Sequence, residues 1–497
     1  MTGVGAYGYG ALSTARADGT FRSLKTELAD LQAQLTSGKR ASTYAGLGAS
    51  ALKSLSGRQT LASIEAYAGN VADAQLRLRV MSTGLDTIDT IARSLTVSLS
   101  DNYEQTPIGQ TSAMVSASDG LKQILDILNM DVDGRYLFAG RASDAEPVAG
   151  YDLIVNGDGT RAGLRQMIAE RQAADLGTSG LGRLTLADTA TGVSIAEEAA
   201  GLPFGMKIEG AAATGSGLTA ATSAGPPPSA TLAVAAQPAA GDTISLSLRL
   251  PDGSTTSLTF TAGADPASNP NAFAIGPNAA ATAANLQAAV RSAISSTAAS
   301  KLAAASALGA SQAFFAGSPG NPPQRVAGPP YATATATVAG SAANTVIWYR
   351  GDDAAGSARE TAPVRTGDGT AVALGARANE PGFQAVLAAL GALVGQDFPP
   401  ATEEAKQRYA ATADAIAASI GTGVEGIVLD FSTASASLDG AEERLGIAKS
   451  QVEDTIAGAE DADPNEVAMK LLQTQTRLQA SYQTTSVIAK LSLVEFI

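Results

Sequence analysis

The 497-residue sequence contains no cysteine and no histidine. The first absence excludes disulfides, thiolate metal sites and cysteine nucleophiles. The second removes the commonest general base, the commonest zinc and copper ligand, and every Ser-His-Asp triad. Paired carboxylates or lysine can still support catalysis. Together the two absences nevertheless favour a protein that is not an enzyme and holds no cofactor or metal.

Aromatic residues make up only 5% of the chain and charged residues 16%. Cores must therefore be built from small side chains and from Leu, Ile and Val, which suits close helix packing. The formal net charge of -14 argues against a nucleic-acid partner, because such binding depends on clustered Lys and Arg.

The N-terminus, from Met1 to Thr20, has no basic region followed by an apolar core, so it does not read as a Sec signal peptide. No apolar run approaches the roughly 20 residues of a membrane span. We therefore expect no membrane insertion. If the protein is secreted, we expect a route without a cleaved signal peptide.

A narrow apolar stripe begins near the N-terminus. Its members follow the 3, 4, 3, 4 spacing of a heptad seam: Phe21, Leu24, Leu28, Leu31 and Leu35. Gly38 ends this predicted helix. One slender helix cannot bury such a stripe on itself, so the pattern predicts a partner helix.

Two further helices are expected in the N-terminal part, at 49–100 and from after Thr106-Pro107 to about Met130. The turn signal Asp133-Gly134 closes the second, and a short strand is expected at 135–138. On the C-terminal side, helices are expected at 380–394 and 403–457.

The last predicted helix starts at Asp463-Pro464, where proline is tolerated in the first turn. Its apolar residues follow helical spacing: Val467, Leu471, Leu478, Tyr482, Val487, Leu491, Val494 and Ile497. Its other face is rich in Gln, Thr and Ser, including Thr474. Uncharged hydrogen-bonding groups suit a crowded helix interface better than a solvated surface, because burying a charge is costly.

The middle of the chain has a different pattern. Residues 242–260 alternate apolar and polar around Pro251-Asp252-Gly253, which is typical of a β-hairpin. A second strand is predicted at 345–350 and a helix at 280–295. Trp348 and Tyr349 are interpreted as core anchors of a β module rather than a sugar-binding platform.

Three acidic, glycine-containing turns could suggest a metal site, at 156–159, 351–353 and 367–369. None has the ligand spacing of a calcium loop, so ordinary turns are favoured. The adjacent Glu pairs, such as Glu197-Glu198, diverge by about 100° on a helix and do not face each other across a substrate. No phosphate-binding glycine motif occurs.

Three segments resemble a known family. The stretch Leu478-Gln-Ala-Ser-Tyr-Gln and the ending Leu491-Ser-Leu are similar to the last helix of the hook-associated protein 3 family, the hook-filament junction proteins of the bacterial flagellin superfamily. Leu35-Thr-Ser-Gly-Lys-Arg is similar to the Leu-Ser-Ser-Gly-Lys/Arg motif that this family shares with flagellins. Gly134-Arg-Tyr-Leu-Phe-Ala-Gly resembles the exit from the helical domain.

Two departures favour the junction proteins over filament flagellins. After Arg40 the sequence lacks the flagellin run Ile-Asn-x-Ala-x-Asp-Asp, and its C-terminus lacks the typical flagellin tail.

The resemblance implies a mainly α, flagellin-like fold, with terminal coiled-coil helices, a long helical bundle and a central outer β-rich insertion. We expect a coiled-coil domain from 1–40 with 461–497 and a helical rod from 41–142 with 380–460. The insertion is divided into 143–220 and a β-rich part, 221–379.

The resemblance further implies a structural flagellar subunit, exported unfolded through the flagellar type III apparatus to the extracellular flagellum. The implied partners are copies of itself, neighbouring hook-associated protein and flagellin subunits, and a flagellar export chaperone. The predicted self-assembly interface comprises Phe21, Leu24, Leu28, Leu31, Leu35, Leu471, Leu478, Tyr482, Leu491 and Val494.

A hook-filament junction adaptor is the first functional hypothesis. A flagellin-type filament subunit is the alternative. A secreted enzyme or adhesin, with its active part in the central β-rich domain, is the alternative of another class.

Overall fold

The fold is described from a computed structural model, which covers residues 7–99, 110–263, 269, 271–398, 402–421 and 423–494. Among these, side chains are described for residue 16 and for residues 18–487. The expected break at Thr106-Pro107 lies outside the described residues.

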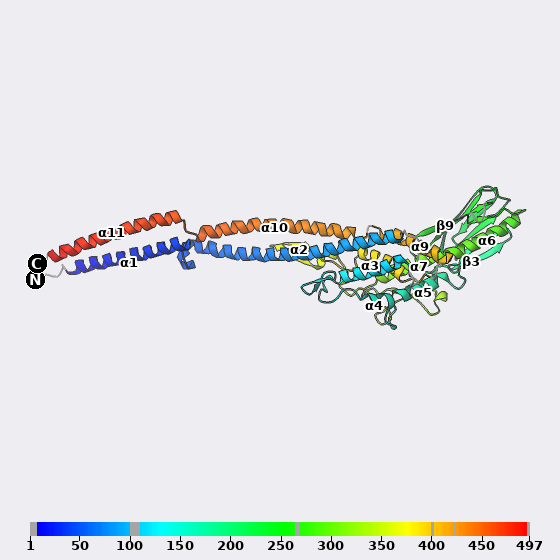
Figure 1. The fold of residues 1–497 in the computed structure, drawn as a ribbon, viewed down its shortest axis with the longest axis horizontal. Coiled ribbons are helices and arrows are strands. Elements are labelled where there is room, and N and C mark those ends of the chain that lie inside the picture. The colour runs from blue at the N-terminus through cyan, green and yellow to red at the C-terminus, as the bar shows by residue number, and fades with distance from the viewer. Residues whose placement is uncertain are drawn as a thin grey trace. The chain divides into compact units, whose positions relative to one another are not determined.

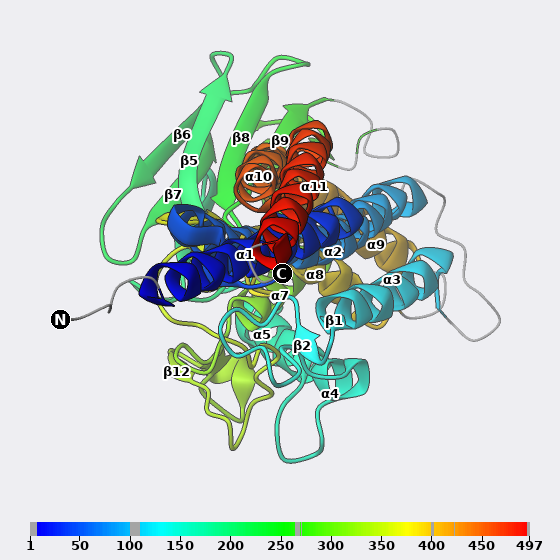
Figure 2. The same cartoon turned by 90° about the vertical axis from the view of Figure 1, so that its left-hand side faces the viewer.

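The chain forms two compact units. The first contains the chain up to Asp73, the segment Arg365–Ala371 and the chain from Ser437 onward, and the second contains Ala74–Val364 and Val372–Ala436. Within the first unit lie the terminal helices α1 (Tyr7–Ser37) and α11 (Pro464–Val494), which Figures 1 and 2 show side by side. The 3-10 helix η1 (Tyr44–Ser50) follows α1.

Two long helices, α2 (Ala51–Leu99) and α10 (Glu425–Glu460), contribute residues to both units. The predicted helix at 49–100 is therefore confirmed as α2. The expected single helix at 403–457 is wrong, because the structure has α9 (Glu403–Ile420) and then α10. Gly421 and Gly423 separate them with positive φ angles of 54° and 50°, a conformation that ends a right-handed helix.

Helix α8 (Pro381–Val394) is the core helix of the second unit. Phe383, Val386, Leu387, Leu390 and Leu393 are each at most 1% exposed. A helix that is apolar on every side has to be surrounded. The helices packed against it are α3 (Ser112–Leu128), α5 (Leu164–Leu176), α7 (Ala303–Phe315) and α9.

A glycine allows one of these close contacts. A Cβ added at Gly391 of α8 would lie 2.6 Å from Ser311 Oγ and 2.8 Å from Phe315 Cε2, both on α7. The helix bundle therefore depends on small residues where its axes approach, as the composition suggested. The short helix α4 (Tyr151–Asn156) lies between α3 and α5 in the chain.

The β-rich part consists of two four-stranded sheets, ordered β3-β4-β7-β6 and β10-β9-β8-β5. The strand bounds are β3 (Leu184–Thr189), β4 (Gly192–Glu197), β5 (Lys207–Thr214), β6 (Leu218–Ser223), β7 (Ser229–Val234), β8 (Thr243–Arg249), β9 (Thr255–Ala262) and β10 (Ala272–Phe273). All neighbours are antiparallel except β10 and β9.

The predicted hairpin is confirmed as β8 and β9, whose register pairs Ile244 with Phe260 and Leu246 with Leu258. These side chains face a core shared by both sheets and by α6 (Ala279–Thr297), which confirms the predicted helix. The core includes residues from Leu184 to Ala305. A division of the insertion at 220 would therefore cut through β6 and through this core.

Three two-stranded sheets complete the described strands: β1 (Asp131–Val132) with β2 (Arg135–Tyr136), β11 (Gln324–Val326) with β12 (Thr337–Ala339), and β13 (Pro363–Gly367) with β14 (Thr370–Ala373). The short 3-10 turns are η3 (Tyr331–Thr333) and η4 (Arg359–Thr361). The π-helical turn η2 (Ala298–Leu302) joins α6 to α7.

The strand predicted at 345–350 is wrong, because this segment makes only isolated bridges, Ala162 with Thr345 and Val148 with Tyr349. Its backbone pairs with single loop residues, so no ladder extends. Trp348 is fully buried, but its indole Nε1 donates to the carbonyl of Phe315 on α7 at 2.9 Å. It is thus an anchor of a helical core and not of a β module.

The architecture is mainly α with a β-rich insertion, as expected for a flagellin-like fold. One described stretch, Glu403–Glu460, is long and apolar enough by composition to cross a membrane. The core helix of a soluble protein meets the same criterion, and α9 ends at Ile420 within this stretch. The absence of membrane insertion stays a prediction.

Candidate self-assembly surface

Helices α1 and α11 pack antiparallel along each other in the first unit. At one end the amide of Ala462 donates to the carbonyl of Gly38 at 2.9 Å. Further along, the rings of Phe21 and Tyr482 meet edge to face with centroids 4.8 Å apart. The partner that the N-terminal heptad requires is therefore the C-terminal helix of the same chain.

The predicted interface residues differ in burial. Leu31 is buried, and Phe21, Leu24, Leu28, Leu471 and Leu478 are half-buried. Leu35 and Tyr482 are 49% and 55% exposed, so neither is enclosed within the chain. The side chains of Leu491 and Val494 lie outside the described residues. Whether these ten residues contact a neighbouring copy remains a prediction.

The seam of α11 includes a residue that the sequence pattern places on its polar face. Thr474 is only 3% exposed, and Val467 is 4% exposed. With Leu471, Leu478 and the half-buried Ser481, these two follow a heptad spacing of 4, 3, 4, 3. Thr474 follows Val467 by seven residues, so a heptad counted strictly from Val467 predicts Thr474 in the seam.

Helix α11 carries a second apolar stripe on the face opposite this seam. Met469, Leu472 and Val487 are 68%, 63% and 54% exposed. At 100° per residue they lie within about 60° of one another and well over 100° from Leu478. Exposed Gln473, Gln479 and Gln483 accompany them. We call Met469, Leu472 and Val487 the outer stripe.

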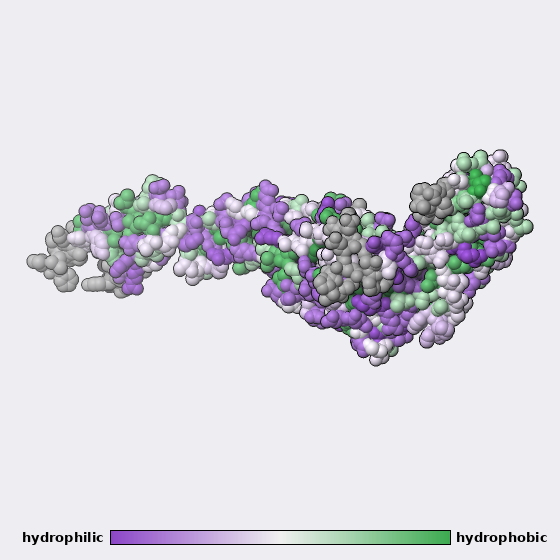
Figure 3. Space-filling view, turned by 45° about the vertical axis from the view of Figure 1, so that its right-hand side comes forward, coloured by the Kyte–Doolittle hydropathy of each residue, from purple (hydrophilic) through white to green (hydrophobic). Residues whose placement is uncertain are grey.

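Other exposed apolar side chains occur on the same unit. They are Leu52 at 77% and Leu55 at 57% at the start of α2, and Ile447 at 55% on α10. Figure 3 shows hydrophobic residues at the surface of the α1–α11 pair. Exposed apolar residues that form a contiguous patch mark interaction sites in soluble proteins.

A polar cluster fastens the segment after α1 to the segment before α11. The carboxylate of Glu460 accepts from Arg58 Nε and Nη2, both at 2.8 Å, and from Ser54 Oγ at 2.6 Å. The ammonium of Lys39 lies 2.5 Å from Asp461 Oδ1. Arg40 Nε donates to the Asp461 carbonyl at 2.7 Å. We call these six residues the Glu460 cluster.

Backbone contacts join the same two segments. Gly38 ends α1 with a φ angle of +68°, and the amide of Arg40 donates to the carbonyl of Glu460 at 2.7 Å. The Ser-Gly-Lys-Arg motif therefore has a structural role: glycine turns the chain, and both basic residues contact Asp461.

Glu460 is only 7% exposed, yet its carboxylate stays ionised. Hydrogen bonds from Arg58 and then from Ser54 lower its pKa from 4.5 to about 2, because they stabilise the charged form. Sequence patterns did not reveal this cluster, because Ser54 and Arg58 are distant from Glu460 along the chain.

Within this unit, helices α2 and α10 approach each other closely beside the Glu460 cluster. A Cβ added at Gly57 of α2 would lie 2.7 Å from Ile456 Cγ1 of α10. Lys449 Nζ and Glu65 Oε1 form an ion pair at 3.1 Å. From the β13–β14 hairpin, Asp368 accepts a hydrogen bond from Tyr67 at 3.0 Å.

The described residues contain no group of three or more carboxylates that could hold a metal ion. Of the acidic turns, Asp158 accepts hydrogen bonds from the amide and the guanidinium of Arg161 and from the amide of Thr160, which lower its pKa. Of the Glu pairs, Glu198 pairs with Arg183 at 3.1 Å, and Glu197 accepts from the amide of Ile208. These contacts order local structure.

Comparison with known proteins gives one family. Residues 12–143 match the family model described as the bacterial flagellin N-terminal helical region. No curated protein matches the chain. The matched region contains α2, α3 and the described α1 seam with its Ser-Gly-Lys-Arg motif. That family is structural, its members self-assemble into flagellar polymers, and it implies the extracellular flagellum as location. The match supports membership of the chain in the flagellin superfamily and a role as a flagellar structural subunit.

Proposed function

We propose that this chain is the adaptor at the junction of hook and filament, and that it assembles with neighbouring subunits through α1 and α11. The observation that carries the assembly surface is the outer stripe. Met469, Leu472 and Val487 stay more than half exposed although α1 already covers the other face of α11.

Burial of this stripe supplies the driving force. Each large apolar side chain that leaves water contributes about 1.5–3 kcal/mol. The uncharged Gln side chains beside it can exchange water for partner groups at a lower cost than charged side chains. Assembly of many copies repeats the gain at every contact, so moderate single contacts produce a stable layer.

The Glu460 cluster supports the same role. It ties the turn at Gly38 to the chain before Pro464, so that α1 and α11 enter the assembly as one antiparallel pair. An adaptor needs such a fixed pair, because both helices must meet neighbouring subunits in register.

The junction role rests on sequence likeness. Leu478-Gln-Ala-Ser-Tyr-Gln is similar to the last helix of hook-associated protein 3, and the flagellin run is missing after Arg40. Its partners would be copies of itself, a neighbouring hook-associated protein, flagellin, and an export chaperone that protects α11 before type III export. The role is structural, and we propose no catalysis.

Substitutions in the outer stripe test the assembly surface. We expect Leu472→Asp with Val487→Asp to leave the monomer folded and to abolish assembly, because each charge would be buried in the contact. The control is Thr60→Asp, which adds a charge at an exposed position of α2 in the same unit. Sedimentation velocity measures assembly and circular dichroism measures folding. Normal assembly of the double variant would refute the surface.

Seeded growth separates the adaptor from a filament subunit. Purified chain is added to hook fragments and to short filament seeds, and growth is followed by electron microscopy. An adaptor adds one layer and stops, whereas a filament subunit elongates the seeds without limit. In cells, deletion of the gene should leave hooks without filaments and release flagellin into the medium. Continued elongation would assign the chain to the filament shaft instead.

A further inference from the structure

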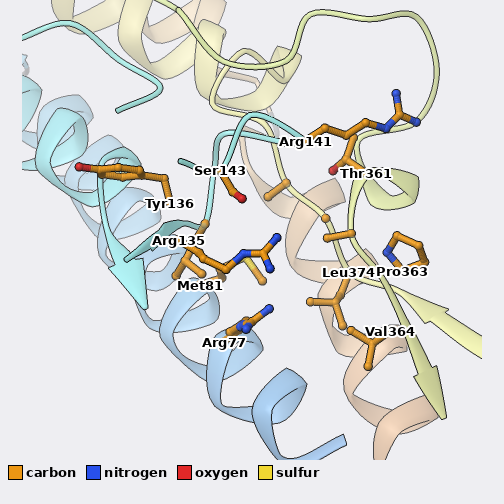
Figure 4. A pocket seen from close by; sticks show the side chains of 15 residues that line it. Arg77, Met81, Arg135, Tyr136, Arg141, Ser143, Thr361, Pro363, Val364 and Leu374 are labelled. Carbon is orange, nitrogen blue, oxygen red and sulfur yellow. The ribbon is translucent and has the colours of Figure 1, made fainter. Parts of the chain in front are cut away.

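The second unit contains a cavity of about 430 Å³. Its lining comes from α2, from the β1–β2 hairpin and the loop after it, and from the chain around β13 and β14. Figure 4 shows these elements around the cavity.

Three arginines line this cavity: Arg77, Arg135 and Arg141. No aspartate or glutamate is among its lining residues. Within the part of the chain that the structure describes, none of the three side chains forms an ion pair.

Several other arginines of the same unit have an acidic partner. Arg171 lies 2.7 Å from Asp175, Arg183 lies 3.1 Å from Glu198, and Arg377 lies 3.4 Å from Asp352. The β1–β2 hairpin beside the cavity carries two carboxylates, Asp131 and Asp133, and neither is among the lining residues. The carboxylate of Asp131 accepts a hydrogen bond from the amide of Gly134. Among the residues that line the cavity, the three guanidinium groups thus have no carboxylate partner.

Two of the arginines point to the same side in the view of Figure 4, where the side chains of Arg77 from α2 and Arg135 from β2 are drawn near each other, whereas that of Arg141 points away from them. Like charges held together without a counter-ion repel each other, and an oxyanion between them would remove that repulsion. Guanidinium groups bind carboxylates with paired, charge-assisted hydrogen bonds.

The lining also has apolar side chains, those of Met81, Leu137, Pro363, Val364 and Leu374, beside the hydroxyl-bearing Tyr136, Ser143 and Thr361. Met81 is 2% exposed and Leu374 is 3% exposed. A cavity of this size and mixed character suits a ligand that has a carboxylate and an apolar part. An acidic side chain on a peptide segment meets both requirements, whereas a small inorganic anion meets only the first.

We propose that this Arg77–Arg135 cavity binds a carboxylate from an acidic segment of a second copy of this chain. A net charge of -14 makes acidic segments abundant on any neighbouring copy. The contact would add a specific, charged attachment to the apolar one made by α11. The identity of the second copy rests on the proposed self-assembly, whereas the carboxylate site does not.

A titration of the full chain with sodium glutarate tests the site without assembly. The chain has seven methionines, so methyl-labelled methionine gives a short NMR spectrum, and Met81→Leu assigns the signal from the cavity. We expect glutarate to shift the Met81 signal in a saturable manner. Arg77→Gln with Arg135→Gln should weaken this binding about tenfold or more, because charge-assisted hydrogen bonds are lost.

The control is Arg79→Gln with Arg350→Gln, which removes two exposed charges outside the cavity lining and should leave the titration unchanged. Sodium phosphate at equal ionic strength should shift Met81 less than glutarate. Three results would overturn the proposal: no shift of Met81, an equal shift in the Arg77/Arg135 variant, or a response to phosphate that matches the response to glutarate.

Cross-linking identifies the source of the carboxylate. Arg135→Lys keeps the charge and allows carbodiimide to join position 135 to a carboxylate that occupies the cavity. Assemblies are made from equal amounts of ¹⁴N and ¹⁵N chains, and Arg79→Lys is the control. Mixed-isotope cross-links to Asp or Glu, above the control level, support a second copy. Cross-links only within one chain, or only to another subunit, refute it.

If the chain does not assemble, the cross-linking experiment fails together with the proposed function. The glutarate titration still reports on the cavity, so the two failures are distinguishable.

Discussion

Helix α8 and helix α11 both carry many apolar residues, but the two helices differ in how far these side chains are buried. Around α8, large side chains such as Phe383 and Leu390 are fully buried by neighbouring helices of the same unit. Along α11, Met469 and Leu472 remain more than 60% exposed. The second unit completes its own core, whereas the α1–α11 pair covers only one of the two faces of α11. The unit that completes its core should govern the stability of the monomer, and the pair should govern association.

The largest expected effect tests that division directly. Leu390→Ala should destabilise the second unit by about 2–5 kcal/mol, because it removes buried methyl groups and leaves a cavity. Leu472→Ala should change monomer stability by less than about 0.5 kcal/mol, because Leu472 is 63% exposed. Urea unfolding measures both. Equal losses would mean that α11 is already enclosed in the monomer.

A smaller effect is expected from close helix packing. Gly391→Ala places a methyl group 2.6 Å from Ser311 Oγ and 2.8 Å from Leu164 Cδ2, so we expect a destabilisation of about 1–3 kcal/mol. The matched control is Gly69→Ala on α2, where an added Cβ meets nothing within 4 Å. That substitution should stabilise its helix by about 0.5–1 kcal/mol. A gain in stability at both positions would show that the side chains around Gly391 can move aside at little cost.

The two regions were also unequally predictable from sequence. Heptad spacing located the seam of α1 and most of the seam of α11, because one partner helix satisfies a simple period. It assigned Thr474 to the wrong face, since a buried threonine resembles the Gln and Thr around it. The resemblance singled out Lys39 and Arg40 as part of a motif, but their contact with Asp461 spans more than 400 residues.

The second unit was harder because its contacts combine distant segments. The segment at 345–350 has the composition of a strand, yet its hydrogen-bond partners are loop residues, and Trp348 is held by α7. The break at Gly421 in a continuous helical pattern was missed, because an isolated glycine is tolerated within helices. The Arg77–Arg135 cavity could not be predicted, since only the fold brings α2 and β2 together.

Acid should loosen the Glu460 cluster before it affects α8. The folded pKa of Glu460, about 2, is below its ordinary value of 4.5, so the stability it contributes is present above pH 4.5 and is lost as pH falls toward 2. Glu460→Gln should cost about 1–2 kcal/mol near pH 7, where the buried Ser54 and the guanidinium of Arg58 lose their charged partner. It should also flatten the stability profile between pH 5 and 2.

Amide hydrogen exchange at Arg40 and Ala462 measures this effect locally, because both amides donate across the cluster. Glu453→Gln is the control, since Glu453 is exposed and its nearest cation is 3.9 Å away. An identical pH profile for the Glu460 variant and the control would exclude the carboxylate as the titrating group.

The smallest expected effect concerns the ring contact between α1 and α11. Edge-to-face aromatic pairs contribute about 0.5–1.5 kcal/mol beyond area burial, and Tyr482 is 55% exposed, so the coupling should lie at the lower end. A double-mutant cycle with Phe21→Leu and Tyr482→Leu isolates that coupling from the change in side-chain size. In the monomer the cycle should give a small favourable value. In the assembly the value should rise if neighbouring subunits exclude water from the pair, because desolvation strengthens the ring electrostatics. An unchanged coupling would place Tyr482 outside the assembly contact, and would leave the outer stripe as the surface of α11 that binds its neighbours.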